Sequence, residues 1–433
     1  MSDAEDEWHD ALSEIDLAEA LQGWEEEGRW HDESVDEAIQ VLKAHGHLLP
    51  ADLEAAAKQD MAAEQLAAVL EGAPRVTVAA VPALKLKRSR SQHLRSSLDA
   101  PGARQLLQQA AQLAADGRVL GAAATLHQLA ELVGGSVEEL AALPDDALAA
   151  ATPAGASLDV ARVLADASAA REALRALEDH KGWMVSRDDA LKVHYRHQRG
   201  TTVHRQAAGR ARPPRAAARL KFSAVFAHPL EHLLALAHEF DLVVTWNKFS
   251  LASIMLAEPS IFESYLYGAQ WMMKPFKNMQ ALLRARGFDL AQEHRCLLVS
   301  IGDCSPEELP QGHVPLPKEW AKRKLINFLA GSCLKLRPLA PSADGAPRTE
   351  GSLLIHLDPH IPFIPAFLLN FVLGVLAPYI FNQMKKVLDG SFADPQGEYS
   401  RRIAAQPQLY GLVRRRMAEY EGELEAEAEA EVL

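Results

Sequence analysis

Two histidines and a glutamate near the middle of the chain have the spacing of a zinc site. The segment His228-Pro-Leu-Glu231-His232 matches the His-x-x-Glu-His form of some zinc peptidases. Histidines four residues apart share one helix face, and the glutamate could act as a general base. However, Pro229 places His228 at or before the helix start, where its side chain need not align with that of His232. No third ligand can be identified, so we interpret the segment as a helix start and predict no metal.

Other reactive residues are arranged unfavourably for chemistry. In His194-Tyr-Arg-His197 the two histidines would point to opposite faces of a strand, which makes them a poor metal pair. No Gly-rich phosphate loop follows a predicted strand, and no Gly-x-Ser-x-Gly elbow occurs. The cysteines at 296, 304 and 333 have no Cys-x-x-Cys spacing, which fits a reducing compartment. Because no acid–base pair stands out either, we predict no catalytic residue, no cofactor and no enzymatic activity.

The charge of the chain also limits its partners. The formal net charge is -13, which argues against nucleic acid. Acidic residues concentrate at the two ends, in Asp3–Glu37 and Glu419–Glu431, where such runs are usually solvated. The N-terminus is acidic and lacks the apolar stretch of a secretory signal, so we expect a cytoplasmic protein.

Helical patterns dominate the first part of the chain, and we divide the rest by composition. Two alanine- and leucine-rich helices, Arg104–Asp116 and Val119–Val133, are separated at Gly117. Ser136 and Glu139 resemble a capping box that starts a third helix. The predicted divisions are an acidic α-helical region at 1–84, a linker and helical hairpin at 85–156, a folded domain at 157–390 and a charged tail at 391–433. The N-terminal helices could dock a protein partner.

The folded domain is predicted to be α+β. An amphipathic helix at Leu158–Leu177 is followed by short segments that alternate apolar and polar residues. One apolar face per strand predicts an antiparallel sheet that is covered on one side only. The predicted strands are Trp183–Ser186, Leu191–His197, a strand around Thr201–His204, Arg219–Ala227, Ile261–Trp271, Arg295–Ile301, Lys324–Leu336 and Ser352–Leu357. A helix begins at Pro229 and runs to about Phe240.

A long apolar helix, Pro365–Leu388, closes the domain and should lie across the concave face of the sheet. The overlapping run Ile361–Met384 has no formal charge and is long enough to span a bilayer. Its prolines, asparagines and Gly374 form a polar or small-residue stripe instead, which suits a helix that covers an apolar cup. We therefore predict a helix that covers the cup, and a transmembrane span remains the alternative interpretation.

This order of elements resembles the START domain, the lipid-binding fold of the steroidogenic-acute-regulatory-related transfer proteins, over about residues 158–390. Three stretches carry the likeness: residues 226–247, which end in Trp246-Asn247; Trp271 followed by Lys274-Pro-Phe-Lys-Asn278; and His356-Leu-Asp-Pro to Asn370-Phe371. The resemblance implies a helix-grip fold, in which a curved antiparallel sheet holds a C-terminal lid helix and encloses one hydrophobic ligand.

An apolar concavity with a few polar groups would suit such a ligand. The residues that we predict to contact it are Phe222, Phe226, Trp246, Tyr265, Tyr267, Trp271, Leu298, Ser300, Ile326, Phe328, Leu354, His356, Phe367, Phe371, Val375 and Tyr379. We expect a carrier or sensor of a lipid or sterol that contacts membrane surfaces transiently. The alternative is an adaptor whose N-terminal helices dock partners and whose START-like half is regulatory.

Overall fold

The computed structural model describes residues 100–143, 158–198, 217–272, 277–359 and 366–432, together with Leu94, Ser97, Leu98 and Leu148. All of them belong to the unit Ser91–Leu433. The predictions for residues 1–84 and for a strand around Thr201–His204 lie outside the described residues.

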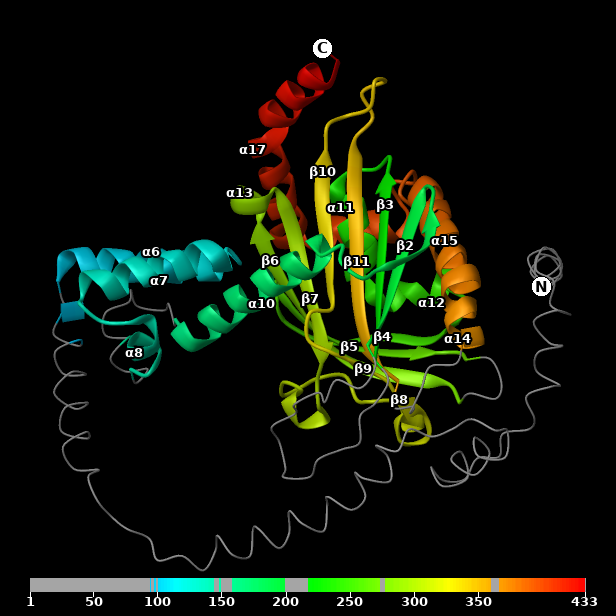
Figure 1. Cartoon of the computed structure of the whole chain (residues 1–433), viewed down its shortest axis with the longest axis horizontal. Coiled ribbons are helices and arrows are strands. Elements are labelled where there is room, and N and C mark those ends of the chain that lie inside the picture. Colours follow the sequence, from blue (N-terminus) through cyan, green and yellow to red (C-terminus); the bar gives the residue numbers. More distant parts are fainter. Residues whose placement is uncertain are drawn as a thin grey trace, which may run out of the picture. The chain divides into compact units, whose positions relative to one another are not determined.

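The centre of the described unit is an antiparallel sheet that curves around a long helix (Figure 1). Its strands follow the order β1-β2-β3-β11-β10-β7-β6-β5-β4. They are β1 (Met184–Asp188), β2 (Leu191–Gln198), β3 (Ala217–Phe226), β4 (Ser250–Ser260), β5 (Glu263–Gln270), β6 (Met279–Leu290), β7 (Cys296–Asp303), β10 (Cys333–Leu339) and β11 (Arg348–Asp358). The short strand β8 (Lys324–Leu325) pairs parallel with β6, and β9 (Asn327–Phe328) pairs antiparallel with β11.

The alternation of side chains along β3 and β11 is as the sequence predicts. The two strands pair antiparallel in unbroken register from Ala218 with Leu357 to Phe226 with Thr349. The first hairpin also turns at Asp188–Asp189 as expected, with Asp188 paired to Lys192. The predicted strand Lys324–Leu336 is wrong as a single element, because it divides into β8, β9 and β10. Strands β4 and β6 were not predicted.

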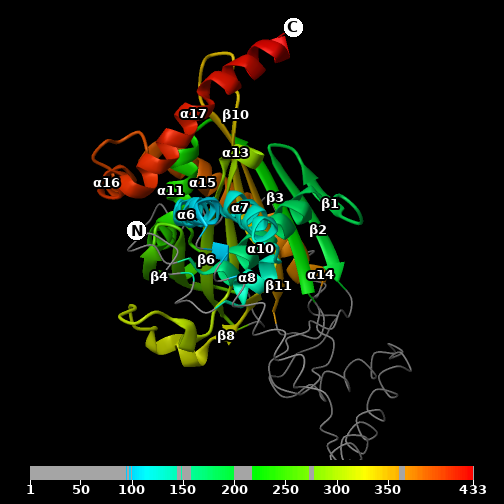
Figure 2. The same ribbon diagram turned by 90° about the vertical axis from the view of Figure 1, so that its left-hand side faces the viewer.

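The convex face of the sheet is covered by the predicted helical hairpin, as Figure 2 shows. Helices α6 (Pro101–Ala115) and α7 (Val119–Leu132) meet at Gly117, and α8 (Val137–Ala141) begins with the expected Ser136–Glu139 capping box. These helices and α10 (Val160–Glu178) share one apolar core with sheet residues that include Leu298 and Leu354. The expectation of a sheet covered on one side only is therefore wrong.

The concave face holds the remaining helices. After β3 come α11 (Leu230–His238), the 3-10 turn η1 (Phe240–Leu242) and α12 (Val243–Trp246). The predicted closing helix is α14 (Ala366–Phe371), a π-helical turn η4 (Val372–Leu376) and α15 (Ala377–Ser391). Two further helices, α16 (Glu398–Ala405) and α17 (Pro407–Val432), follow it. Shorter elements at the edges are α13 (Ala291–His294), η2 (Pro306–Glu308) and η3 (Lys318–Lys322).

The C-terminal helices belong to the core of the domain. Tyr410 is fully buried and Val413 almost so, and both lie in the cluster that contains Leu220, Leu233 and Leu388. This packing extends the folded domain beyond residue 390, into the part of the chain predicted as a charged tail.

Candidate ligand cavity

A cavity of about 700 Å³ lies between the concave face of the sheet and the helices that cover it. Alternate residues of β3 and β11 form one wall, and α11, the lid helix α14–α15 and α17 form the other. This volume falls within the usual range of about 300–1,000 Å³ for a small-molecule pocket. Its lining is overwhelmingly apolar, with members such as Leu220, Leu236, Met255, Leu266, Leu283, Val299, Leu334, Leu353, Ile355, Leu357, Val372, Ile380 and Met384.

Small residues on the strands shape this space. Gly268 on β5 lets the ring of Phe240 pack against the strand, because a Cβ atom there would lie 3.2 Å from a ring carbon, closer than side chains normally pack. Ala224 on β3 and Ala281 on β6 line the cavity where larger residues would fill it. The concavity is therefore encoded in the strands themselves, through residue size as well as curvature.

Six of the residues predicted to contact a ligand line the cavity: Phe222, Phe226, Trp246, Leu298, Ile326 and Phe328. The structure thus brings together strands β3, β7 and β9 with α12 at one site. Leu298 borders the cavity but also belongs to the core beneath α6, α7 and α10. Whether these six side chains bind a ligand remains a prediction.

Five residues that were predicted to contact a ligand lie on the other side of the sheet and do not line the cavity. Tyr265 donates a hydrogen bond to Glu263 at 3.2 Å. Tyr267 donates to Gln280 at 3.0 Å and packs edge-on against Trp320. Both tyrosines lie in a cluster covered by the segment around η2 and η3. The other three, Ser300, Leu354 and His356, lie on strand positions that alternate with the cavity-lining ones.

The aromatic stripe of the lid helix also faces away from the cavity. Phe371 and Tyr379 both pack edge-on against Phe249, which in turn contacts Trp271 at a centroid distance of 5.8 Å. Val375 is not among the lining residues either, and the side chain of Phe367 lies outside the described residues. The lid instead presents an aliphatic stripe to the cavity: Leu368, Leu369, Val372, Leu376, Ile380 and Met384, together with Phe381.

Helix α17 lines the cavity at positions that the sequence analysis did not select. Leu409, Leu412, Val413 and Arg416 contact the space at three- and four-residue steps. This helical spacing was the available signal. It was obscured because the surrounding residues are mostly charged or alanine.

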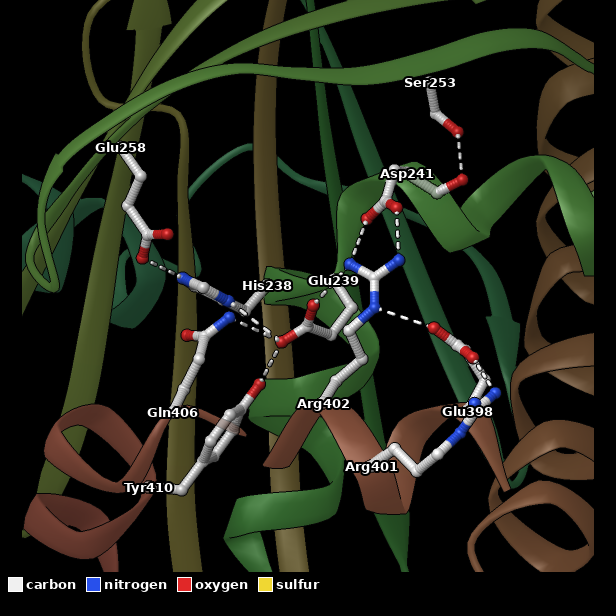
Figure 3. Close-up of polar contacts among 10 residues, drawn as sticks. All are labelled: His238, Glu239, Asp241, Ser253, Glu258, Glu398, Arg401, Arg402, Gln406 and Tyr410. Carbon is white, nitrogen blue, oxygen red and sulfur yellow. Dashed lines mark hydrogen bonds and ion pairs between the residues drawn. The ribbon is translucent and has the colours of Figure 1, made fainter. Parts of the chain in front are cut away.

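A buried polar cluster fastens α16 and α17 to the end of α11 (Figure 3). At its centre, Glu239 is 2% exposed and accepts a hydrogen bond from Tyr410 at 2.7 Å. Arg402 donates to Glu239 at 3.2 Å and forms two hydrogen bonds with Asp241, at 2.7 and 3.2 Å. Gln406 adds a further hydrogen bond to Glu239. We call these residues, with His238, the Glu239 cluster.

The ionisation of the Glu239 cluster follows from its contacts. Burial alone would raise the pKa of Glu239, but hydrogen bonds from His238 and Tyr410 outweigh it and hold the pKa below its ordinary value. Burial acts to lower the pKa of His238, but its bonds to Glu239 and Glu258 raise that pKa to about 9. His238 is therefore an imidazolium at neutral pH. The cluster thus contains charges that are paired rather than poised for proton transfer.

One ion pair interrupts the apolar lining at the end of the cavity next to α17. Arg416 donates through Nε to Asp289 at 2.5 Å, and Asp289 is 2% exposed. Asp289 lies near the end of β6, where its backbone N–H donates to the carbonyl of Gly117. The sheet, the α6–α7 turn and α17 therefore meet at this residue.

The zinc-like segment has other contacts. His228 bonds to Asp389 at 2.8 Å, and the ring of His232 stacks on Phe392 at 4.5 Å. Pro229 stands at the N-cap of α11, which agrees with our interpretation of a helix start. In the part of the chain that the structure describes, no group of three or more His, Cys, Asp and Glu side chains is placed to hold a metal.

Comparison with known proteins concerns the fold. No protein-family model and no curated protein matches the sequence. Similar solved structures include human StAR-related lipid transfer protein 5, with a TM-score of 0.39, 12% identity and coverage of 55% of this chain and 100% of that one. For human STARD10 the TM-score is 0.38 and the identity 13%, and the match covers 56% of this chain and 85% of that one. For a STAR-related lipid transfer protein fragment from Xanthomonas axonopodis the TM-score is 0.32 and the identity 18%, and the match covers 48% of this chain and 99% of that one.

The described unit is similar in fold to these START domains. Its antiparallel sheet and the lid helix on the concave face agree with the expected α+β helix-grip fold. Among the described helices, which include residues 366–384 of the rival membrane span, none combines the length and apolar character needed to cross a bilayer.

Proposed function

We propose that the START-like domain binds one lipid-sized hydrophobic ligand in the cavity and carries or senses it. The observation that supports this proposal is an apolar space of about 700 Å³ inside a folded domain. Close-packed interiors seldom leave such a volume without a ligand to fill it. A ligand that buries about 300 Å² of apolar surface there would gain about 7 kcal/mol before ordering costs.

Exchange of the ligand would occur at a membrane surface through the lid helix. The π-helical turn at Val372–Leu376 supports this role, because such turns weaken the regular hydrogen bonding of a helix and are frequent at functional sites. Trp271 is 37% exposed and is connected to Phe371 of the lid through Phe249. An exposed tryptophan beside the lid suits the interface between water and lipid.

Native mass spectrometry with lipid extraction on the full chain tests the proposal. Two neighbouring residues of β3 provide a matched pair of variants: Ala224 lines the cavity, and Val225 is 52% exposed on the other face. Ala224→Trp should abolish a stoichiometric lipid adduct, whereas Val225→Trp should retain it. If the folded wild-type chain carries no lipid and takes none from vesicles, the proposal is wrong.

A further inference from the structure

We propose that the convex face of the sheet binds an inorganic phosphate ion at Arg196, Arg219 and His356. These residues lie side by side on neighbouring strands, because Arg219 of β3 is paired with Arg196 of β2 and with His356 of β11. They lie on the face opposite to the cavity, since the alternating residues Leu220 and Ile355 line the cavity. The phosphate site is therefore separate from the proposed hydrophobic ligand and goes beyond the proposed function.

The charge of Arg219 has no partner in the part of the chain that the structure describes. Its guanidinium makes no hydrogen bond or ion pair there, although the side chain is partly buried. Burial and the neighbouring charge of Arg196 lower the pKa of Arg219, and the carboxylates of Glu172 and Asp179 only partly offset them. Like charges opposite each other on neighbouring strands are destabilising. An anion beside the two arginines would relieve this repulsion.

Both arginines have donors available for such an anion. Arg196 uses Nη1 for Asp179 and for the carbonyl oxygen of Lys181, at 3.1 and 3.2 Å. A guanidinium has five N–H groups, so Nε and Nη2 of Arg196 and every N–H of Arg219 remain for a ligand. The side chain of Arg196 is 32% exposed, which leaves the site open to solvent. Planar guanidinium groups match pairs of phosphate oxygens in geometry and charge.

His356 contributes an acceptor rather than a donor. It is 8% exposed, and its Nε2 atom is buried without a hydrogen-bond partner among the described residues. Nδ1 lies 3.3 Å from the carbonyl oxygen of Ala330, so Nδ1 carries the proton and Nε2 the lone pair. Burial and the charge of Arg219 lower the pKa of His356, so the ring is neutral at neutral pH. Buried polar atoms are nearly always hydrogen-bonded, and Nε2 therefore calls for a donor.

Phosphate satisfies both requirements at once. Near neutral pH the ion is negatively charged and still has a P–OH group. Its charged oxygens can accept from the arginines, and its hydroxyl can donate to Nε2 of His356. Sulfate and carboxylates lack this hydrogen, so they leave Nε2 without a donor unless the buried ring is protonated. A water molecule could donate to Nε2, but it would leave the charge of Arg219 uncompensated.

Isothermal titration calorimetry of the full chain at about pH 7.5 and constant ionic strength tests this inference. We expect saturable binding of inorganic phosphate, about tenfold tighter than that of sulfate, because one hydrogen bond to a buried acceptor distinguishes the two ions. Glycerol phosphate has almost no P–OH at this pH, since the second pKa of a phosphate monoester is about 6, and should bind as weakly as sulfate. Equal affinity for the three ions would overturn the role of His356 and the choice of phosphate.

Three variants locate the site. Arg219→Met should weaken phosphate binding about tenfold or more, and His356→Leu should bring phosphate and sulfate within about twofold of each other. Arg337→Met is the matched control and should bind phosphate as wild-type protein does, because Arg337 lies on the same face of the sheet but pairs with Glu350.

Hydrogen exchange of wild-type protein gives a second readout that does not depend on the folding of the variants. Phosphate should slow exchange in β2, β3 and β11 more than in β5. Absence of saturable phosphate binding to wild-type protein would overturn the site, as would equal affinities in Arg219→Met and Arg337→Met. Either result would leave the proposed function untouched, because the cavity lies on the other face of the sheet.

Discussion

Replacing Arg402 by methionine removes an ion pair with the buried carboxylate of Glu239. Among the described residues, no other arginine bonds to Glu239. Arg402 bonds to Glu239 and Asp241 from α16, and Glu239 is buried beneath it. The methionine keeps much of the packing of the side chain but leaves a buried carboxylate with one cation fewer. The change therefore tests whether the C-terminal helices are held by this charge or only by apolar contacts.

The expected loss is about 2 kcal/mol of unfolding free energy. Removing one partner of a buried ion pair costs about 3–5 kcal/mol when the remaining charge has no other partner. Here the cost is smaller, because His238 and Tyr410 continue to bond Glu239. Urea unfolding of the full chain measures the total. Hydrogen exchange should show the loss first in α16 and the beginning of α17.

Arg401→Met is the matched control, because Arg401 is 65% exposed at its side chain and pairs only with Glu398 among the described residues. It should change stability by less than about 0.5 kcal/mol. Adding Glu239→Gln to Arg402→Met should recover part of the loss, since no buried charge then remains unpaired. Equal losses of stability in Arg402→Met and Arg401→Met would contradict this prediction, because the buried position of Glu239 would then have no energetic consequence.

Two further predictions concern the pH dependence of stability and a buried hydrogen bond next to the start of β10. Since the pKa of His238 rises from its ordinary 6.5 to about 9 on folding, its stabilisation is fully present below pH 6.5 and is lost as pH rises through 9. The unfolding free energy from urea titrations should be lower at pH 9.5 than at pH 6 in wild-type protein, and the difference should be smaller in His238→Gln. An equal difference in both proteins would contradict the prediction. Ser332→Ala should cost about 1–2 kcal/mol, because buried Ser332 accepts from the His356 backbone N–H at 2.9 Å. A loss below about 0.3 kcal/mol in thermal unfolding would show that this hydrogen bond is dispensable.

The sequence predicted those elements whose two faces differ clearly. In β3 the apolar positions Leu220, Phe222, Ala224 and Phe226 alternate with polar ones, and all four line the cavity. The α6–α7 hairpin and the capping box of α8 were also predictable, because glycine and serine mark their boundaries. Such elements can be predicted from the local sequence, because a polar face or a boundary residue identifies them.

Strand β6 was not predicted, and both of its faces are covered. One face lines the cavity, and the other is covered by ion pairs and apolar contacts. Arg284 and Arg286 lie on the covered convex side and pair with Glu263 on β5 and Asp166 on α10. The same face also carries the buried apolar residues Leu282 and Phe288, so the two arginines do not make it a polar face that would identify a strand. Their partners are distant in the sequence, so only the tertiary structure explains them.

The two tyrosines of β5 show why parity alone could not assign the cavity. Tyr265 and Tyr267 share one face and Leu266 lies on the other, so either face could have been concave. The segment that contains Trp320 covers the tyrosines, and this cover is not visible in local sequence. The choice between the faces required knowledge of what packs on each.

Photo-crosslinking of the full chain with a diazirine-bearing fatty alcohol, followed by peptide mass spectrometry, tests the location of the ligand most directly. We expect adducts on β3, β11 and α15, at residues such as Phe222, Leu353 and Phe381, and few adducts in Ala224→Trp. Adducts confined to the convex face, on α6, α7 or the β5 tyrosines, or an unchanged pattern in Ala224→Trp, would contradict it.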